Sequence, residues 1–278
     1  MTPTKYFNIV AIIQGRMSSS RLPGKVLLDL GGKPMLQRVV DRVALSRLVS
    51  KIVVATSSDP SDDPIERYCL ENNIACHRGS LHDVLDRFET AAERYNADLI
   101  VRVTADCPFI DPKVIDQVIQ LITDSPVDQP IDFSANRLPP PFHRTYPIGL
   151  DVEVCTMDTL KIAWNNAKEQ FHREHVMPFL YEDVELRTQS NGNQLGKSKN
   201  AFSVAILNNP IDFGEKRWTV DTPEDHQFAQ QLMGMIKNID SYTWLDLLQV
   251  VQDHPAIEDI NADVRHKSMK EVDQRAKK

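Results

Sequence analysis

The first half of the chain alternates short apolar runs with amphipathic segments, and this alternation constrains the fold more than any other feature. Residues 8–14, 51–56 and 99–104 are of strand length and almost continuously apolar, as strands buried on both faces are. Between them, apolar residues recur at helical spacing, as at Leu36, Val39 and Val43. The sequence therefore predicts an α/β fold over roughly residues 5–125, with a mostly parallel central sheet flanked by helices.

The second half of the chain is less regular. Prolines punctuate residues 126–147, and alternating apolar and acidic residues at 150–155 predict a strand with one face in water. A capping box at 222–225 predicts the start of a helix. We further expect helices at 157–167, 174–181 and 240–251, short strands at 202–207 and 218–220, and a polar, mobile loop at 189–200.

The length of 278 residues suits one large domain or two small ones. A single α/β domain over residues 1–256 is the simpler interpretation. It includes a smaller inserted region at about 126–215. Residues 257–278 are charged and are expected to form a loosely ordered tail.

Composition excludes several classes of function. The net charge of −7 disfavours a broad nucleic-acid surface, and no apolar run is long enough for a membrane span. The first eight residues do not resemble a secretory signal. The four cysteines form no C-x-x-C pair, so we expect free thiols in a reducing compartment, the cytoplasm. They are Cys69, Cys76, Cys107 and Cys155.

The loop after the first apolar run has the composition of a phosphate-binding loop. Ligands of parallel sheets bind beyond the carboxyl ends of the strands. Residues 15–24 hold two glycines, three consecutive serines, Arg16 and Arg21, and Lys25 follows directly. Accessible amides, hydroxyls and fixed positive charge suit a polyphosphate. The loop is neither a Walker loop nor a dinucleotide fingerprint, and a solvated cationic surface loop is the alternative.

Two aspartates are candidates for holding a hard cation. Asp106 follows the apolar run at 99–104, and Asp221 follows the short strand expected at 218–220. Mg²⁺ is usually bound by one or two carboxylates together with substrate phosphates. The alternative for Asp221 is a plain helix cap.

Two further polar groups have open interpretations. Asp151 and Glu153 share one face of the expected strand, where they can bind sugar hydroxyls or protect an exposed edge. Residues 172–175, His-Arg-Glu-His, do not match a zinc motif, but Arg173 suits an anionic substrate.

Residues 12–27, IIQGRMSSSRLPGKVL, resemble the N-terminal signature of the sugar-acid cytidylyltransferases. This family includes the acylneuraminate and 3-deoxy-manno-octulosonate enzymes, and the likeness is strongest to the spore coat polysaccharide biosynthesis branch. At 105–108 the chain reads Ala-Asp-Cys-Pro, which departs from the Gly-Asp-x-Pro form of the octulosonate enzymes. The sugar is therefore not fixed by the resemblance. Further matching blocks lie at 78–80, 83–88, 102–108, 144–153, 173–176 and 218–225.

The resemblance implies a nucleotide-diphosphosugar transferase-like fold and the reaction of CTP with a sugar acid to give a CMP-sugar and pyrophosphate, for surface polysaccharide or glycan biosynthesis. It also implies a homodimer, with an arm from the region 126–215. By the same likeness, the triphosphate would contact Gly15, Arg16, Ser20, Arg21 and Lys25, and Mg²⁺ would be held by Asp106 and Asp221. The base and ribose would lie near Arg78, Ser80 and Asp83, and the sugar near Asn136, Tyr146, Asp151, Glu153, Arg173 and His175. Arg16, Lys25 and Asp106 would be the catalytic residues.

Three alternative functions remain open at this point. One is a nucleotidyltransferase acting on a sugar 1-phosphate, which would need an additional phosphate site. Another is a glycosyltransferase, although no clear Asp-x-Asp pair follows Val103. The third is a non-catalytic nucleotide-binding regulator.

Overall fold

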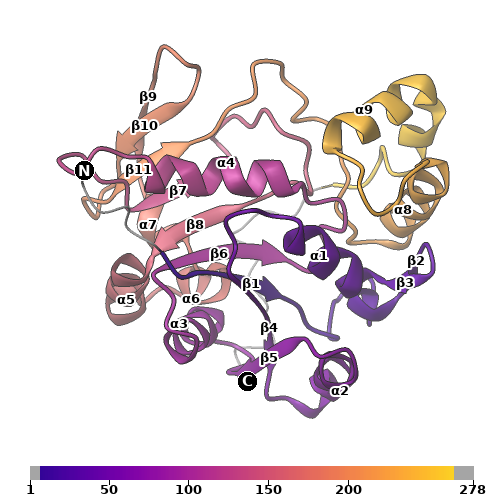
Figure 1. Cartoon of the computed structure of the whole chain (residues 1–278), viewed down its shortest axis with the longest axis horizontal. Coiled ribbons are helices and arrows are strands. Elements are labelled where there is room, and N and C mark those ends of the chain that lie inside the picture. The colour runs from indigo at the N-terminus through magenta and orange to yellow at the C-terminus, as the bar shows by residue number, and fades with distance from the viewer. Residues whose placement is uncertain (1–6, 266–278) are drawn as a thin grey trace.

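The structure is a computed structural model that describes residues 7–265, and its centre is a nine-stranded sheet within those residues (Figure 1). The strand order is β5-β4-β1-β6-β8-β7-β11-β10-β9. The first four strands in this order are parallel and confirm the expected βαβ pattern. They are β1 (Ile9–Gln14), β4 (Lys51–Ser57), β5 (Ala75–Gly79) and β6 (Leu99–Thr104).

Helices cover both faces of this parallel half. Alternate residues of β1 enter two separate apolar cores, Ala11 and Ile13 in one and Val10 and Ile12 in the other. The β1 strand is therefore buried on both sides, as its continuous apolar run predicts. Helices α1 (Met35–Ala44) and α4 (Pro112–Thr123) bury residues in the first core, and α3 (Val84–Arg94) does so in the second. The parallel half also contains the helix α2 (Asp63–Glu71) and the small hairpin of β2 (Asp29–Leu30) and β3 (Lys33–Pro34).

The second half of the chain extends the same sheet. β8 (Glu153–Thr156) is antiparallel to β6 and to β7 (Phe133–Ala135), so it joins the two halves. The remaining strands are β9 (Glu185–Thr188), β10 (Gln194–Lys197) and β11 (Ser203–Ile206). The helices are α5 (Met157–Asn166), α6 (Gln170–His175), α7 (Pro178–Tyr181), α8 (Pro223–Met235) and α9 (Trp244–Asp253), followed by the 3₁₀ segment η3 (Pro255–Ile260).

Several expectations for the second half are wrong. The helix expected at 174–181 is interrupted, because Val176 takes a positive φ of 71° between α6 and α7. The loop expected at 189–200 contains β10. Its Gly196 is needed because a Cβ there would lie 2.0 Å from the carbonyl oxygen of Glu185 on the neighbouring strand. Close strand packing, and not loop mobility, explains this glycine.

Two other boundaries also differ from the predictions. Residues 218–220 form no strand, although an isolated bridge joins Arg217 to Ile148. The last helix begins at Trp244 and not at 240, because Thr243 provides its capping box. Of the tail expected at 257–278, residues 266–278 lie outside the described part, while η3 includes its first residues.

Within residues 7–265, no helix combines the length and apolar character required to cross a membrane.

The strand expected at 150–155 with one wet face is instead buried on both faces. Glu153 is only 3% exposed because it pairs with Arg102 on the neighbouring strand β6. The Arg102 guanidinium also donates to the Gln14 side-chain oxygen at 3.1 and 3.3 Å. Glu153, whose acidic side chain led us to expect a solvent-exposed face, therefore belongs to a buried ion pair between the two halves of the sheet.

We predict that Glu153→Leu lowers the free energy of unfolding by about 3–5 kcal/mol, because it leaves the Arg102 charge buried without its carboxylate. Replacing both partners, as Arg102→Met with Glu153→Leu, should recover most of the loss, since no charge is then buried. Urea unfolding of the three proteins measures both effects. A single variant as stable as the parent would show that the pair contributes nothing at this seam.

Candidate active site

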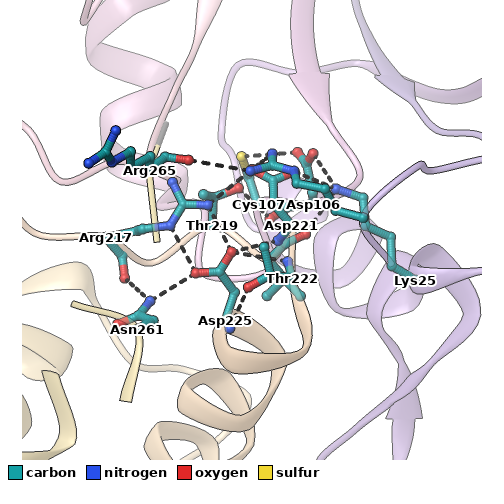
Figure 2. A network of polar contacts seen from close by, with 12 residues as sticks. Lys25, Asp106, Cys107, Arg217, Thr219, Asp221, Thr222, Asp225, Asn261 and Arg265 are labelled. Carbon is teal, nitrogen blue, oxygen red and sulfur yellow. Dashed lines mark hydrogen bonds and ion pairs between the residues drawn. The ribbon is translucent and has the colours of Figure 1, made fainter. Parts of the chain in front are cut away.

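At the carboxyl ends of β1 and β6, one ammonium group contacts two carboxylates. The Lys25 Nζ donates to Asp106 Oδ2 and to Asp221 Oδ1, both at 2.8 Å, and to the Val220 carbonyl oxygen at 2.9 Å (Figure 2). Lys25 begins the 3₁₀ turn η1 (Lys25–Leu27), Asp106 lies two residues after β6, and Asp221 lies two residues before α8. The structure thus brings together three residues that the sequence proposed separately.

Burial and ion pairing act in opposite directions on these groups. Burial lowers the pKa of Lys25, but Asp106 and Asp221 more than offset it and hold that pKa above its ordinary value. Burial raises the pKa of Asp221, but Lys25, Arg21 and Arg217 outweigh it and hold that pKa well below its ordinary value. At neutral pH, Lys25 is therefore a cation and Asp221 an anion.

The loop 15–24 is a closed turn with defined anchors. Its ends are fixed by backbone bonds from Gly15 to the Ala55 carbonyl (3.2 Å) and from Gly24 to the Met17 carbonyl (2.8 Å). The Met17 N–H also donates to the buried Asp62 carboxylate at 2.7 Å. Gly24 has a φ of 72°, which favours glycine and turns the chain into η1. These contacts favour a loop of defined shape over the solvated cationic surface loop that was the alternative.

The cationic and hydroxyl residues of this loop are differently exposed. Arg16 is half-buried and Ser20 is exposed. Arg21 pairs with Asp221 Oδ2 at 2.9 Å, and its Nη1 donates to the Arg265 carbonyl oxygen at 3.4 Å. Arg21 and Lys25 therefore approach Asp221 from the same loop, which ties this loop to the segment before α8.

Arg217 and Asp225 fix Asp221 in place, and sequence reasoning gave neither of them a site role. Arg217 Nη2 lies 3.2 Å from Asp221 Oδ2, and the guanidinium forms two 2.8 Å bonds to Asp225 (Figure 2). Asp225 is fully buried and also accepts the backbone N–H groups of Asp221 and Thr222. The sequence predicted the capping box that Asp225 completes, and the structure confirms it. The additional pairing of Asp225 with Arg217 could be recognised only in the folded structure.

The residues expected near the base and ribose have mainly internal partners. Arg78 pairs with Asp63 at 2.8 Å and Glu66 at 2.6 Å. The Ser80 hydroxyl accepts the Asp83 N–H at 3.0 Å, and Asp83 caps α3. Both Asp83 oxygens also accept from Arg173 Nε at 2.9 Å, so one pair joins a residue expected at the nucleotide to one expected at the sugar.

Several of the other residues expected at the sugar are buried. Asn136 is fully buried and bonds to the backbone of residues 150 and 152, at 2.7 and 2.9 Å. Tyr146 packs edge-on against Trp244, and burial raises the pKa of its phenol to about 12. Asp151 pairs with Arg137 and Arg144. Asn136 and Tyr146 thus have clear structural tasks, as does Glu153. His175 is half-buried at the end of α6.

The comparison with known families identifies the chain. Residues 10–232 match the family model described as cytidylyltransferase. The chain belongs to the cytidylyltransferase family. It is therefore a nucleotidyltransferase, and the family resemblance carried by residues 12–27 is confirmed.

Three individual matches accompany this assignment. The spore coat polysaccharide biosynthesis protein SpsF of Bacillus subtilis is 33% identical over 232 residues, 81% of this chain and 86% of that protein. The 3-deoxy-manno-octulosonate cytidylyltransferase of Geobacter sulfurreducens is 40% identical over 121 residues, 43% of this chain and 47% of that protein. The structure of a cytidylyltransferase from Leptospira borgpetersenii has 29% identity and a TM-score of 0.79, covering 94% of this chain and 100% of the other.

The carboxylates of this cytidylyltransferase suit Mg²⁺ only in combination with other ligands. Asp106 and Asp221 are oxygen donors that already converge on one cation. Within residues 7–265, no group of three or more His, Cys, Asp or Glu side chains is placed to hold a metal. Mg²⁺ commonly takes one or two carboxylates and completes its shell with water and substrate phosphates. The donor set fits that pattern.

Asp225 offers a test of the support beneath the cytidylyltransferase site. Asp225→Ala should lower the free energy of unfolding by about 3–5 kcal/mol, because it strands the buried Arg217 charge as well as opening a capping box. Asp246 is the matched control, since it completes the capping box of α9 on the surface. Asp246→Ala should cost about 1 kcal/mol. Equal losses in thermal or urea unfolding would contradict a special role for the Arg217 contact.

Proposed function

We propose that this cytidylyltransferase transfers CMP from CTP to a hydroxyl group of an acidic sugar and releases pyrophosphate. The observation that carries the proposal is the convergence of Lys25, Asp106 and Asp221 beside the cationic loop 15–24. The relative from Geobacter sulfurreducens is named for an acidic sugar, and SpsF for polysaccharide biosynthesis. These names support a sugar acid as acceptor and a surface polysaccharide as destination.

The chemistry needs alignment and charge neutralisation more than covalent help. A sugar hydroxyl attacks the α-phosphorus in line, its proton is lost, and pyrophosphate leaves. Arg16, Arg21 and Lys25 supply fixed positive charge to the phosphate oxygens, and the loop amides and Ser20 supply donors. No enzyme nucleophile takes part, so no covalent intermediate forms.

Asp106 and Asp221 would hold Mg²⁺ against the phosphates. When bound, the ion neutralises phosphate charge and acidifies the attacking hydroxyl. Asp221 is suited to this task because Arg217 and Asp225 keep its carboxylate in position. The Thr104 hydroxyl similarly holds Asp106 Oδ1.

The remaining contacts suggest how the two substrates meet. Asp83 and Arg173 already form one pair, which places the end of the predicted base site beside a guanidinium. Arginine binds carboxylates through two parallel bonds, so Arg173 is our candidate for the carboxylate of the sugar acid. Arg78 and Ser80 would then border the base and ribose, and Asp151 and His175 the sugar.

Two broader expectations remain proposals. The four cysteines are free thiols in the structure, in agreement with a reducing, cytoplasmic location. We also propose a homodimer, because symmetric dimers are the commonest oligomers and the family resemblance implies one. Light scattering that finds a monomer at working concentration would contradict it.

The substrate proposal predicts pyrophosphate release from CTP with Mg²⁺ and a free sugar acid, and little release from ATP, GTP or UTP. The measurement is a matrix of the four nucleoside triphosphates against a panel of sugar acids and sugar 1-phosphates, read by phosphate detection after pyrophosphatase. Release with sugar 1-phosphates alone would replace the proposed acceptor. Binding of CTP without release for any acceptor would favour a regulator.

The phosphate-binding role predicts that Lys25→Ala and Arg16→Ala each reduce turnover on the order of 10²-fold or more, as loss of an oxyanion donor does. Lys33→Ala is the control, because Lys33 pairs with the surface residue Asp41 and should leave turnover near the parent value. Near-parent turnover in both site variants would remove the phosphate-binding role of the loop.

A further inference from the structure

All four oxygens of the two site carboxylates already have partners. Asp221 Oδ1 accepts from Lys25, and Asp221 Oδ2 contacts Arg21 and Arg217. Asp106 Oδ2 accepts from Lys25, and Asp106 Oδ1 accepts from the Thr104 hydroxyl. A divalent cation that takes an oxygen from each carboxylate must therefore compete with these partners for the same atoms, and Lys25 is the partner common to both carboxylates.

The local charge also opposes a bare cation. In the described part of the chain, the three cations Lys25, Arg21 and Arg217 face the three carboxylates of Asp106, Asp221 and Asp225. The cluster is balanced, so an added divalent ion meets no net negative charge. A nucleotide triphosphate changes this balance, because it brings several negative charges to the same place.

The partners differ in how firmly they are held. Arg217 is fixed by its two bonds to Asp225, and Asp225 in turn accepts from Asn261 at 3.0 Å. Among the described residues, the Lys25 ammonium instead contacts the two site carboxylates themselves and the Val220 carbonyl oxygen. Its flexible four-carbon side chain follows the turn at Gly24, next to the proposed phosphate loop.

We propose that Lys25 is a built-in counter-cation that keeps divalent ions off Asp106 and Asp221 until nucleotide phosphates draw its ammonium away. This inference rests on the proposed function, because it requires a phosphate ligand in the loop 15–24. It assigns Lys25 two successive partners, first the carboxylates and then the phosphates. Metal binding thereby depends on the nucleotide, and the enzyme does not bind free divalent ions at this site.

The test is a titration of the full chain with Mn²⁺ alone, in the absence of CTP and sugar, followed by the electron paramagnetic resonance signal of free Mn²⁺. Lys25→Met removes the charge and keeps the side-chain length. We expect it to bind Mn²⁺ at least roughly tenfold more tightly than the parent. The reason is that the interaction free energy of a close charge pair commonly exceeds the free energy that corresponds to a tenfold change in affinity. Adding Asp106→Asn to Lys25→Met should abolish the gain, which locates it at this site.

Two controls complete the experiment. Lys33→Met removes a surface charge paired with Asp41 and should leave Mn²⁺ affinity unchanged. Lys25→Gln is the second variant to use if Lys25→Met does not fold, as judged by circular dichroism. Unchanged or weaker Mn²⁺ binding by the folded charge-free variant would overturn the proposal.

The outcome separates this inference from the proposed function. Cytidylyl transfer by the parent together with unchanged Mn²⁺ affinity in Lys25→Met would overturn the counter-cation role alone. Tighter Mn²⁺ binding in Lys25→Met would support the counter-cation role even where the pyrophosphate assay rejects CTP and sugar acids as substrates.

Discussion

The contact of Lys25 with Asp106 and Asp221 is the interaction on which the rest of the site depends. It joins three segments that are 81 and 196 positions apart in the chain, namely the turn after the first loop, the end of β6 and the start of α8. Because the ammonium is buried, its charge must be matched, and two carboxylates match it. The same contact therefore joins the fold at this edge of the sheet and brings together the groups that we propose for nucleotidyl transfer.

The charged residues around this contact are of two kinds, buried ion pairs and cations that extend from a turn. Arg217 with Asp225, and Arg102 with Glu153, are buried pairs in which each charge has a fixed partner. They support Asp221 and the seam between the parallel and antiparallel halves of the sheet. Arg21 and Lys25 instead extend from a turn toward the place where phosphates are proposed to bind. Buried support beneath the cations of this turn suits a reaction that depends on positioning.

The fold and the family explain why few side chains need to react. Parallel strands end at a common edge, so one loop and two carboxylates from distant segments can converge there without any dedicated domain. The nucleotide carries its own leaving group, and the protein contributes charge and alignment. Several polar residues expected at the sugar, such as Asn136 and Tyr146, also have internal contacts that stabilise the second half of the chain. The acceptor side of the site is thus less fully defined by the contacts than the phosphate side.

The sequence by itself determined the parallel half of the sheet, the cap of α8, the cationic loop and the two candidate carboxylates. These features are local, because strand burial, helix capping and loop composition leave periodic or positional patterns in neighbouring residues. Only the tertiary structure decided that Glu153 is buried against Arg102, that Gly196 belongs to a strand and that Asp225 anchors Arg217. Each of these depends on a partner outside the local pattern of neighbouring residues, from 8 positions away for Arg217 and Asp225 to 51 for Arg102 and Glu153. The sign of a charge does not reveal whether its neighbour in space is water or an opposite charge.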